Sequence, residues 1–247
     1  LSAALFLAED EAMPKHIDHF GMDLAAVKAA IEQLKAEQIP LAGIHIFRGS
    51  NTFTRLAFDT LEHLPKVLSQ IESLLGYPLN AINIGGGFEP DIYERNFDFA
   101  AYREALTALS SYEIMHETGR GIFASAGYFI TTVVAVKTIN QQAIVVCDGG
   151  MAQNFLLAQT EKTIKKYLSP QLCQLSQATR PVLQSKAKIV GNSCNREDVI
   201  GQLASGTPSP AVGDKLIFSD CGAYNRTYSP IQFLGLPGAQ EYILSGQ

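Results

Sequence analysis

The stretch Ala81–Phe88 reads AINIGGGF, in which a short apolar run leads into three consecutive glycines. Short apolar runs of this kind are typical of buried strands in a parallel sheet. Glycines directly after such a strand let backbone N–H groups approach an anion with no side chain in the way, and a phosphate is the usual anion. Tight turns also use glycine, so both interpretations stay open here. Gly85, Gly86 and Gly87 are therefore candidate phosphate-binding residues.

Helix and strand patterns alternate on both sides of this stretch. Asp23 is the expected N-cap of a first helix that has its apolar residues on one face. Alternation with short links predicts a parallel sheet, either a barrel or a doubly wound sheet. About three strand–helix units precede residue 120, whereas a complete eight-fold barrel needs ~250 residues. A barrel therefore implies that the chain holds only its last part. The elements expected after the first helix are a strand at 43–47, a helix at 54–75, a strand at 81–84, a helix at 98–109 and a strand at 112–116.

The pattern changes near residue 125. Runs rich in β-branched residues are separated there by Gly, Pro, Ser and Asn, which is typical of a mostly β domain. The sequence thus predicts two domains, a partial (β/α) barrel over residues 1–125 and a C-terminal β domain over 126–247. Strands of the second domain are expected at 129–136, 143–147, 186–190 and 215–219.

Glu117-Thr118-Gly119-Arg120 follows the expected strand at 112–116 and so brings charged groups to the carboxyl edge of the sheet. An arginine there can bridge phosphate oxygens with two hydrogen bonds. A carboxylate there can keep a pyridine nitrogen protonated, which is how a protein tunes pyridoxal phosphate as an electron acceptor. The alternative for these residues is an internal ion pair.

Further candidates follow other expected strands. Phe47 and Ser50 come at the end of the strand at 43–47, where Phe47 either lies against a flat cofactor or belongs to the core. Cys194 stands in the polar segment GNSCNRED at 191–198, which indicates a surface or interface loop with a thiol. Tyr224 follows the strand at 215–219 after a bend of small residues, so its hydroxyl either donates to a phosphate or is structural.

Composition narrows the classes of function. The formal net charge is -5 and basic clusters are absent, which argues against a nucleic-acid surface. The four cysteines show neither a CxxC pair nor metal-ligand spacing, so they indicate reduced thiols of a cytosolic protein and no metal site is predicted. The longest uncharged run, 121–136, is shorter than the ~20 apolar residues of a membrane helix.

Taken in order, these segments resemble the ornithine/diaminopimelate decarboxylase family, the fold-type III pyridoxal-phosphate enzymes. The resemblance extends from about Phe20 to Tyr228. It implies an alanine-racemase-like (β/α)8 barrel followed by a mostly β domain. The segments that carry it are FGM at 20–22, GIHIFRGS at 43–50, NIGGGF at 83–88, ETGRGIFASAG at 117–127, DGGM at 148–151, VGNSCNREDVIG at 190–201 and GDKLIFSDCGAY at 213–224.

The resemblance implies roles for matching positions. Glu117 would pair with the pyridine nitrogen, and Phe47 takes the place of the family's ring-stacking histidine. Cys194 would belong to a loop lent by the partner subunit of a homodimer with shared active sites, and would return a proton after carbon dioxide leaves. The cofactor phosphate would be held by Ser50, Gly85, Gly86, Gly87, Gly119, Arg120 and Tyr224. The charges of the loop itself, apart from the resemblance, make Asn195, Arg196, Glu197 and Asp198 candidate substrate-binding residues: Arg196 could meet a carboxylate, and Glu197 or Asp198 an amine.

Two departures from the family pattern matter. Asn195 stands where diaminopimelate enzymes carry a substrate-reading glutamate, which puts that substrate in doubt. The Schiff-base lysine of the family lies far upstream, in a "YAVKAN"-like motif on the first barrel strand. Lys137 has a similar local sequence but follows Ser125-Ala126-Gly127, and therefore matches a strand of the β domain. We expect the segment with the Schiff-base lysine to lie outside this chain.

The function implied is decarboxylation of an amino acid, free or tethered to a carrier protein, by a cytoplasmic, pyridoxal-phosphate-dependent homodimeric carboxy-lyase. One alternative is a catalytically inactive regulator that binds a decarboxylase, although the glycines, Arg120 and Tyr224 favour cofactor binding. A second is an amino-acid racemase of the same fold. Racemases place an arginine against the pyridine nitrogen, so Glu117 argues against that reading.

Overall fold

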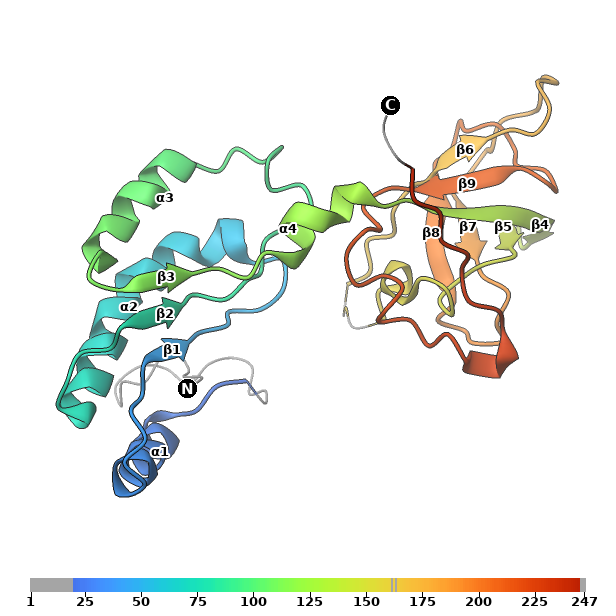
Figure 1. The fold of residues 1–247 in the computed structure, drawn as a ribbon. Coiled ribbons are helices and arrows are strands. Elements are labelled where there is room, and N and C mark those ends of the chain that lie inside the picture. The colour runs from blue at the N-terminus through green and yellow to red at the C-terminus, as the bar shows by residue number, and fades with distance from the viewer. Residues whose placement is uncertain (1–19, 161, 163, 245–247) are drawn as a thin grey trace. The chain divides into compact units, whose positions relative to one another are not determined.

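The computed structural model describes residues 20–160, 162 and 164–244 (Figure 1). The first 19 residues, which the domain prediction includes, lie outside the described residues. The described chain divides into two compact units, one ending at Ile122 and one beginning at Phe123. Among the described residues no helix is both long and apolar enough to cross a membrane.

The first unit contains a three-stranded parallel sheet in the order β1-β2-β3. Its strands are in register, with Gly43 opposite Ala81 and Ala81 opposite Glu113. The predicted parallel sheet with intervening helices is therefore confirmed for these strands. The elements are α1 (Leu24–Ala36), β1 (Gly43–His45), α2 (Phe53–Leu75), β2 (Ala81–Asn83), α3 (Phe99–Ala105), a 3-10 turn (Leu106–Leu109), β3 (Glu113–Met115) and α4 (Gly119–Phe123).

Local sequence accounts for the helix ends. The Asp23 carboxylate accepts a hydrogen bond of 2.8 Å from the backbone N–H of Ala26, so the expected N-cap of α1 is confirmed. Helix α2 ends at Gly76, whose φ of 84° is the left-handed conformation that glycine adopts without strain. Each strand is shorter than predicted: residues 46–47 after β1, residue 84 after β2 and residues 112 and 116 on either side of β3 belong to the adjoining loops.

The core of the first unit lies between the helices and the sheet. Helix α2 is buried along one face, and Leu64 and Ile71 are fully inaccessible to solvent. Ile44 of β1 and Ile82 of β2 belong to the same cluster. Burying an aliphatic side chain of this size contributes about 1.5–3 kcal/mol. The packing therefore fixes the strands, and with them the loops that leave their carboxyl ends.

The second unit is mostly β, as predicted, and its six strands run in the order β6-β9-β4-β5-β7-β8. The β5–β7 pair is parallel and the other neighbours are antiparallel. Leu216 and Ile189 are fully buried between the strands. The strands are β4 (Phe129–Ile139), β5 (Gln142–Cys147), β6 (Gln171–Cys173), β7 (Ala187–Val190), β8 (Val199–Leu203) and β9 (Lys215–Phe218).

Two of these strands, β6 and β8, were not expected from the sequence. Strand β6 is an edge strand of three residues, too short to show a pattern. Strand β8 contains Gly201, a residue that usually indicates a turn. A Cβ at Gly201 would lie 2.7 Å from the ring of Phe218. Glycine is therefore needed in β8 because an aromatic ring packs against its backbone.

Candidate functional site

Three loops leave the same edge of the first sheet, because parallel strands end together at their carboxyl side. They are the segments 46–50 after β1, 84–88 after β2 and 116–118 between β3 and α4 (Figure 1). Their backbones are joined directly: the N–H of Glu117 donates to the carbonyl of Gly85 over 2.9 Å. The fold therefore brings together residues that lie up to about seventy positions apart in the sequence.

The glycine loop lies between the other two with no room for side chains. A Cβ at Gly85 would lie 2.3 Å from the carbonyl oxygen of Ile46, and one at Gly86 would lie 2.3 Å from that of Glu117. A Cβ at Gly87 would meet the carbonyl oxygen of Gly49 at 2.6 Å. These contacts require glycine at all three positions, whatever the loop binds.

Two amides of this loop are available to a ligand. The N–H of Gly85 donates to the side-chain oxygen of Asn83 at 2.8 Å. The N–H groups of Gly86 and Gly87, in contrast, have no acceptor among the described residues. Neighbouring backbone N–H groups of this kind suit an anion. The residues present therefore fit the phosphate group that the sequence predicts at this edge.

Glu117 points its carboxylate out of the same edge. Its side chain is 60% exposed, and Oε1 accepts a hydrogen bond of 2.8 Å from the amide of Asn83. The Nε2 atom of His45 lies 3.8 Å from the same oxygen. The carboxylate thus has a fixed neighbour on the protein side and remains open to a positively charged group on the other.

An aromatic cluster supports the loop after β3. The rings of Phe53 and Phe88 stack with centroids 3.8 Å apart, and the ring of His116 is edge-on to both. The Tyr102 hydroxyl lies 3.3 Å from Nε2 of His116. Burial lowers the pKa of His116 and raises the pKa of Tyr102. Both groups are therefore neutral at neutral pH, as a packed supporting cluster requires.

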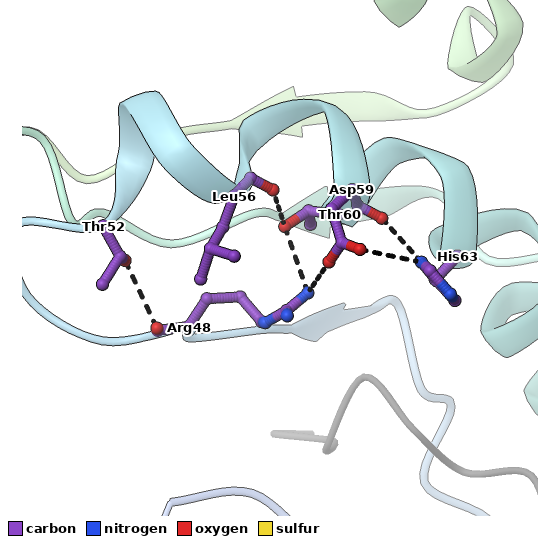
Figure 2. A network of polar contacts seen from close by, with 6 residues as sticks. All are labelled: Arg48, Thr52, Leu56, Asp59, Thr60 and His63. Atoms are coloured by element: carbon purple, nitrogen blue, oxygen red, sulfur yellow. Dashed lines mark hydrogen bonds and ion pairs between the residues drawn. The ribbon is translucent and has the colours of Figure 1, made fainter. Parts of the chain in front are cut away.

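The loop after β1 is tied to helix α2 by a polar network (Figure 2). Nη1 of Arg48 donates to Asp59 at 2.9 Å and to the Thr60 hydroxyl at 3.5 Å. The other carboxylate oxygen of Asp59 lies 3.7 Å from Nδ1 of His63. The Thr52 hydroxyl donates to the carbonyl of Arg48 at 3.3 Å. The loop is consequently tied to α2 and to its N-cap residue through Arg48.

Phe47 and Ser50 lie within this loop. Phe47 is half-buried, with its ring 5.1 Å from that of Phe20, and Ser50 is exposed. Neither is part of the buried cluster of the first unit. Both therefore remain accessible from the sheet edge.

A buried carboxylate, Glu89, lies just after the glycine loop and binds the start of helix α2. Its side chain accepts from the Thr54 hydroxyl at 2.6 Å and from the Thr54 N–H at 3.3 Å, in the first turn of α2. The carbonyl of Gly87 accepts from the N–H of Phe53 at 3.1 Å. Hydrogen bonds thus connect the start of α2 with the end of the glycine loop.

In the second unit, Tyr224 follows β9 in a left-handed conformation with φ of 64°, and 53% of the residue is exposed. A Cβ at Gly222, two residues earlier, would lie 1.9 Å from the carbonyl oxygen of Phe123. The bend before Tyr224 therefore depends on glycine, and it turns the tyrosine outward.

Asp198 organises the loop at 191–198. It is 3% exposed, and its carboxylate accepts from the Ser193 hydroxyl at 2.6 Å and from the Met151 N–H at 2.7 Å. A Cβ at Gly150 or at Gly191 would lie 2.4 Å from Oδ1 of Asp198. The two glycines therefore make room for the carboxylate, which ties the loop to the end of β5.

The remaining residues of this loop are exposed. Cys194 and Arg196 both lie at the surface of the unit. The side-chain oxygen of Asn195 accepts from the N–H of Glu197 at 2.9 Å and shapes a tight turn. The Glu197 carboxylate forms an ion pair with Lys165. The thiol and the guanidinium are thus the groups that this turn presents to its surroundings.

Residues 9–222 match the family described as pyridoxal-dependent decarboxylase, C-terminal sheet domain. The chain belongs to this family. It is 24% identical over 231 residues to an L-glutamyl-(BtrI acyl-carrier protein) decarboxylase of Niallia circulans, a match that covers 88% of this chain and 54% of the relative. It is also 24% identical over 233 residues to a diaminopimelate decarboxylase of Deinococcus radiodurans, covering 92% of this chain and 55% of that relative. The chain thus spans about half the length of these curated relatives.

A solved structure shows the same fold. The lysine/ornithine decarboxylase of Vibrio vulnificus complexed with cadaverine superimposes with a TM-score of 0.71 at 24% identity, over 91% of this chain and 60% of that one. Over the aligned residues, this chain therefore has the same fold as that decarboxylase, with an α/β part followed by a sheet domain.

Sequence reasoning missed several residues that shape these loops. Asn83, His116 and Glu89 were not singled out, although each is next to a quoted motif or inside it. A polar residue that interrupts an apolar strand, as Asn83 does, was the one available signal. The first unit brings together Phe47, Ser50, Gly85, Gly86, Gly87, Glu117, Gly119 and Arg120, whereas Cys194, Asn195, Arg196, Glu197, Asp198 and Tyr224 belong to the second unit.

Proposed function

We propose that this chain contributes to a pyridoxal-phosphate-dependent decarboxylase that acts on an amino acid or on an aminoacyl group tethered to a carrier protein. The observation that carries the proposal is the pair of N–H groups at Gly86 and Gly87, beside the exposed carboxylate of Glu117. Membership of the pyridoxal-dependent decarboxylase family supports it. In this proposal residues 1–125 are the last part of a barrel that binds the cofactor, and 126–247 are the C-terminal β domain.

Several residues of the sequence motifs would hold the cofactor. Glu117 would face the pyridine nitrogen, and Phe47 would lie against the ring. When bound, pyridoxal phosphate would supply an electron acceptor for the loss of carbon dioxide. The phosphate would be held by the N–H groups of the glycine loop and by the side chains of Ser50, Arg120 and Tyr224, with Gly119 giving close backbone access.

The loop at 191–198 would complete the site from the partner subunit of a homodimer. Cys194 would act there as the proton donor, a role in which a positioned acid contributes ~10²–10⁴-fold. Asn195, Arg196 and Glu197 face the substrate, and Asp198 takes part by holding their loop in place. The proposed location is the cytoplasm, where thiols such as Cys194 stay reduced.

The curated relatives named above differ in their substrates. One relative acts on a glutamyl group carried by an acyl-carrier protein, and another is named for diaminopimelate. Asn195 offers an amide where a glutamate would recognise the ammonium group of diaminopimelate, which favours a substrate other than diaminopimelate. The proposal therefore includes both a free amino acid and a tethered aminoacyl group.

The test uses the whole purified protein with added pyridoxal phosphate. We expect a visible absorption band from protein-bound cofactor and release of carbon dioxide from one member of a panel of free and carrier-tethered amino acids. Cofactor binding with loss of optical activity but no carbon dioxide would instead identify a racemase. Absence of the absorption band, together with binding to a separate decarboxylase, would identify a regulator and overturn the proposal.

A further inference from the structure

The loop at 191–198 carries charges of both signs, and the structure shows which of them can meet a ligand. A substrate with an ammonium group away from its reacting carbon needs an acceptor there, whereas one with a carboxylate or a phosphate needs donors. The sequence leaves both possibilities open, because Arg196 stands directly before Glu197 and Asp198. The hydrogen bonds and ion pairs of the loop decide between them.

Asp198 is enclosed by the protein. It is 3% exposed, and both of its carboxylate oxygens are occupied. Oδ1 accepts from the N–H of Met151 at 2.7 Å, while Oδ2 accepts from the N–H of Ser193 at 3.1 Å and from the hydroxyl of the same residue at 2.6 Å. A buried carboxylate with these partners belongs to the framework of the loop and is closed to a substrate amine.

The charge of Glu197 is compensated by a lysine of the same unit. Its carboxylate forms an ion pair with Nζ of Lys165, whose side chain is 25% exposed. The segment that carries this lysine is closed by two hydrogen bonds, of 2.6 and 2.9 Å, between the Gln159 side chain and the backbone of Lys166. A substrate ammonium group would therefore have to displace a lysine that the fold already holds beside Glu197.

Asn195 and Arg196, in contrast, present donors. The side-chain oxygen of Asn195 accepts from the N–H of Glu197 at 2.9 Å. This contact fixes the orientation of the amide, because a backbone N–H can only donate and therefore pairs with the oxygen. Among the described residues, neither the NH₂ group of Asn195 nor the exposed guanidinium of Arg196 has an acceptor. The structure describes every residue of this loop, and its exposed part offers N–H donors without an uncompensated carboxylate.

We propose that the substrate carries a negatively charged group away from its reacting carbon, and that Arg196 selects the substrate by binding this group. The inference rests on the proposed function, in which this loop faces the substrate. Two sources share the required chemistry. One is the side-chain carboxylate of a free acidic amino acid, and the other is the phosphate of the phosphopantetheine arm that carries a tethered aminoacyl group.

A guanidinium suits both sources, because its planar fork of N–H groups can bind two oxygens of a carboxylate or of a phosphate at once. A substrate ammonium group would meet a like charge and no acceptor, which lowers its affinity. Selection of this kind acts on binding, so a change at Arg196 should raise KM more than it lowers kcat.

The test uses the whole protein loaded with pyridoxal phosphate and measures binding without turnover. The matched probes γ-aminobutyrate and putrescine have carbon chains of equal length and share one primary amine, but the other end is a carboxylate in the first and an ammonium in the second. If a free acidic amino acid is the substrate, γ-aminobutyrate should bind at least about tenfold more tightly than putrescine, because a hydrogen bond to a charged group contributes this much. Binding is followed by calorimetry.

A second pair of probes examines the tethered source. Phosphopantetheine and pantetheine differ only in the phosphate. If the anion is the phosphate of the arm, phosphopantetheine should bind at least about tenfold more tightly than pantetheine, for the same reason. In that case γ-aminobutyrate and putrescine should bind alike, so the two pairs of probes distinguish the sources.

Arg196→Glu reverses the charge that makes the selection. The matched control is Lys186→Glu, since Lys186 is exposed just before β7 in the same unit and its substitution changes the net charge equally. We expect Arg196→Glu to lose the preference for the anionic probe, a decrease of at least about tenfold relative to Lys186→Glu. The absorption of bound cofactor should be the same in both variants, which shows that both are folded and loaded.

Lys165→Met gives an intermediate result. It releases the carboxylate of Glu197, which then offers an acceptor to an ammonium group. The preference for the anionic probe should narrow, by less than about fivefold, because a partly exposed ion pair is weak. A wider preference in this variant would contradict the inference.

A parent protein that prefers neither anionic probe, or an Arg196→Glu variant that keeps the preference of Lys186→Glu, would overturn the inference and leave the proposed function standing. Release of carbon dioxide from lysine or ornithine, but from no acidic or tethered substrate, would do the same. A parent protein that binds no pyridoxal phosphate would overturn the proposed function, and the inference with it.

Discussion

The loops at the edge of the first sheet and the loop at 191–198 are held in place by different means. At the sheet edge, neighbouring backbones lie so close together that Gly85, Gly86 and Gly87 have no space for a side chain. In the second unit, one buried carboxylate, Asp198, collects the hydrogen bonds that shape the loop. The first arrangement is rigid and leaves N–H groups available for an anion. The second depends on one side chain and presents other side chains outward.

The difference suggests a division of labour between binding and chemistry. Backbone N–H groups suit a constant partner such as a cofactor phosphate, because they are pre-oriented and cost little to keep in place. In a loop shaped by one carboxylate, the exposed residues can be replaced by others without altering the backbone conformation. Cys194 and Arg196 are such outer residues. Variants in each region can therefore break or sharpen this comparison.

The largest effect is expected from Cys194→Ala, measured as turnover of the whole protein. If this loop supplies the proton, turnover falls by about 10²–10⁴-fold while the absorption of bound cofactor is unchanged. The matched control is Cys173→Ala, because Cys173 is also exposed but lies in the edge strand β6. Equal turnover in the two variants would show that the loop has no part in proton transfer.

Asp198→Ala tests whether one carboxylate shapes the second region. The change leaves the N–H of Met151 and the hydroxyl of Ser193 without an acceptor, so the free energy of unfolding should fall by about 3 kcal/mol. The control is Glu197→Gln, which removes only a half-exposed ion pair worth less than about 1 kcal/mol. Denaturant titration of both variants gives the two values. Similar losses would mean that the loop is held by something other than Asp198.

Arg120→Ala should give the smallest change in free energy and should affect the first region alone. Loss of a charge-assisted bidentate contact to a phosphate weakens cofactor affinity by at least about tenfold, the equivalent of ~1.4 kcal/mol. Thermal unfolding of the cofactor-free variant checks that it is still folded. Arg103→Ala, on the exposed side of α3, is the control and should bind the cofactor as the parent does. Full cofactor retention by Arg120→Ala after dialysis would place the phosphate elsewhere.

Much of the fold was predictable because its signals are local. The N-cap of α1 at Asp23 and the end of α2 at Leu75 depend on neighbouring residues, and both are where the sequence predicts them. The short apolar runs before the glycines and before Glu117 likewise form the parallel sheet. Strand β8 was missed because Gly201 is explained only by the ring of Phe218, which comes from another strand.

In the candidate site, too, some features follow from the local sequence and others from the tertiary structure. The sequence by itself determined the motif residues at the sheet edge, since a chain of strand, glycines and charged turn specifies its own local conformation. Only the tertiary structure decided that Asn83 connects Gly85 with Glu117, and that Asp198 is buried rather than exposed with its neighbours. The reason is physical: a hydrogen bond between side chains of different strands depends on register and packing, which no local pattern of residues encodes.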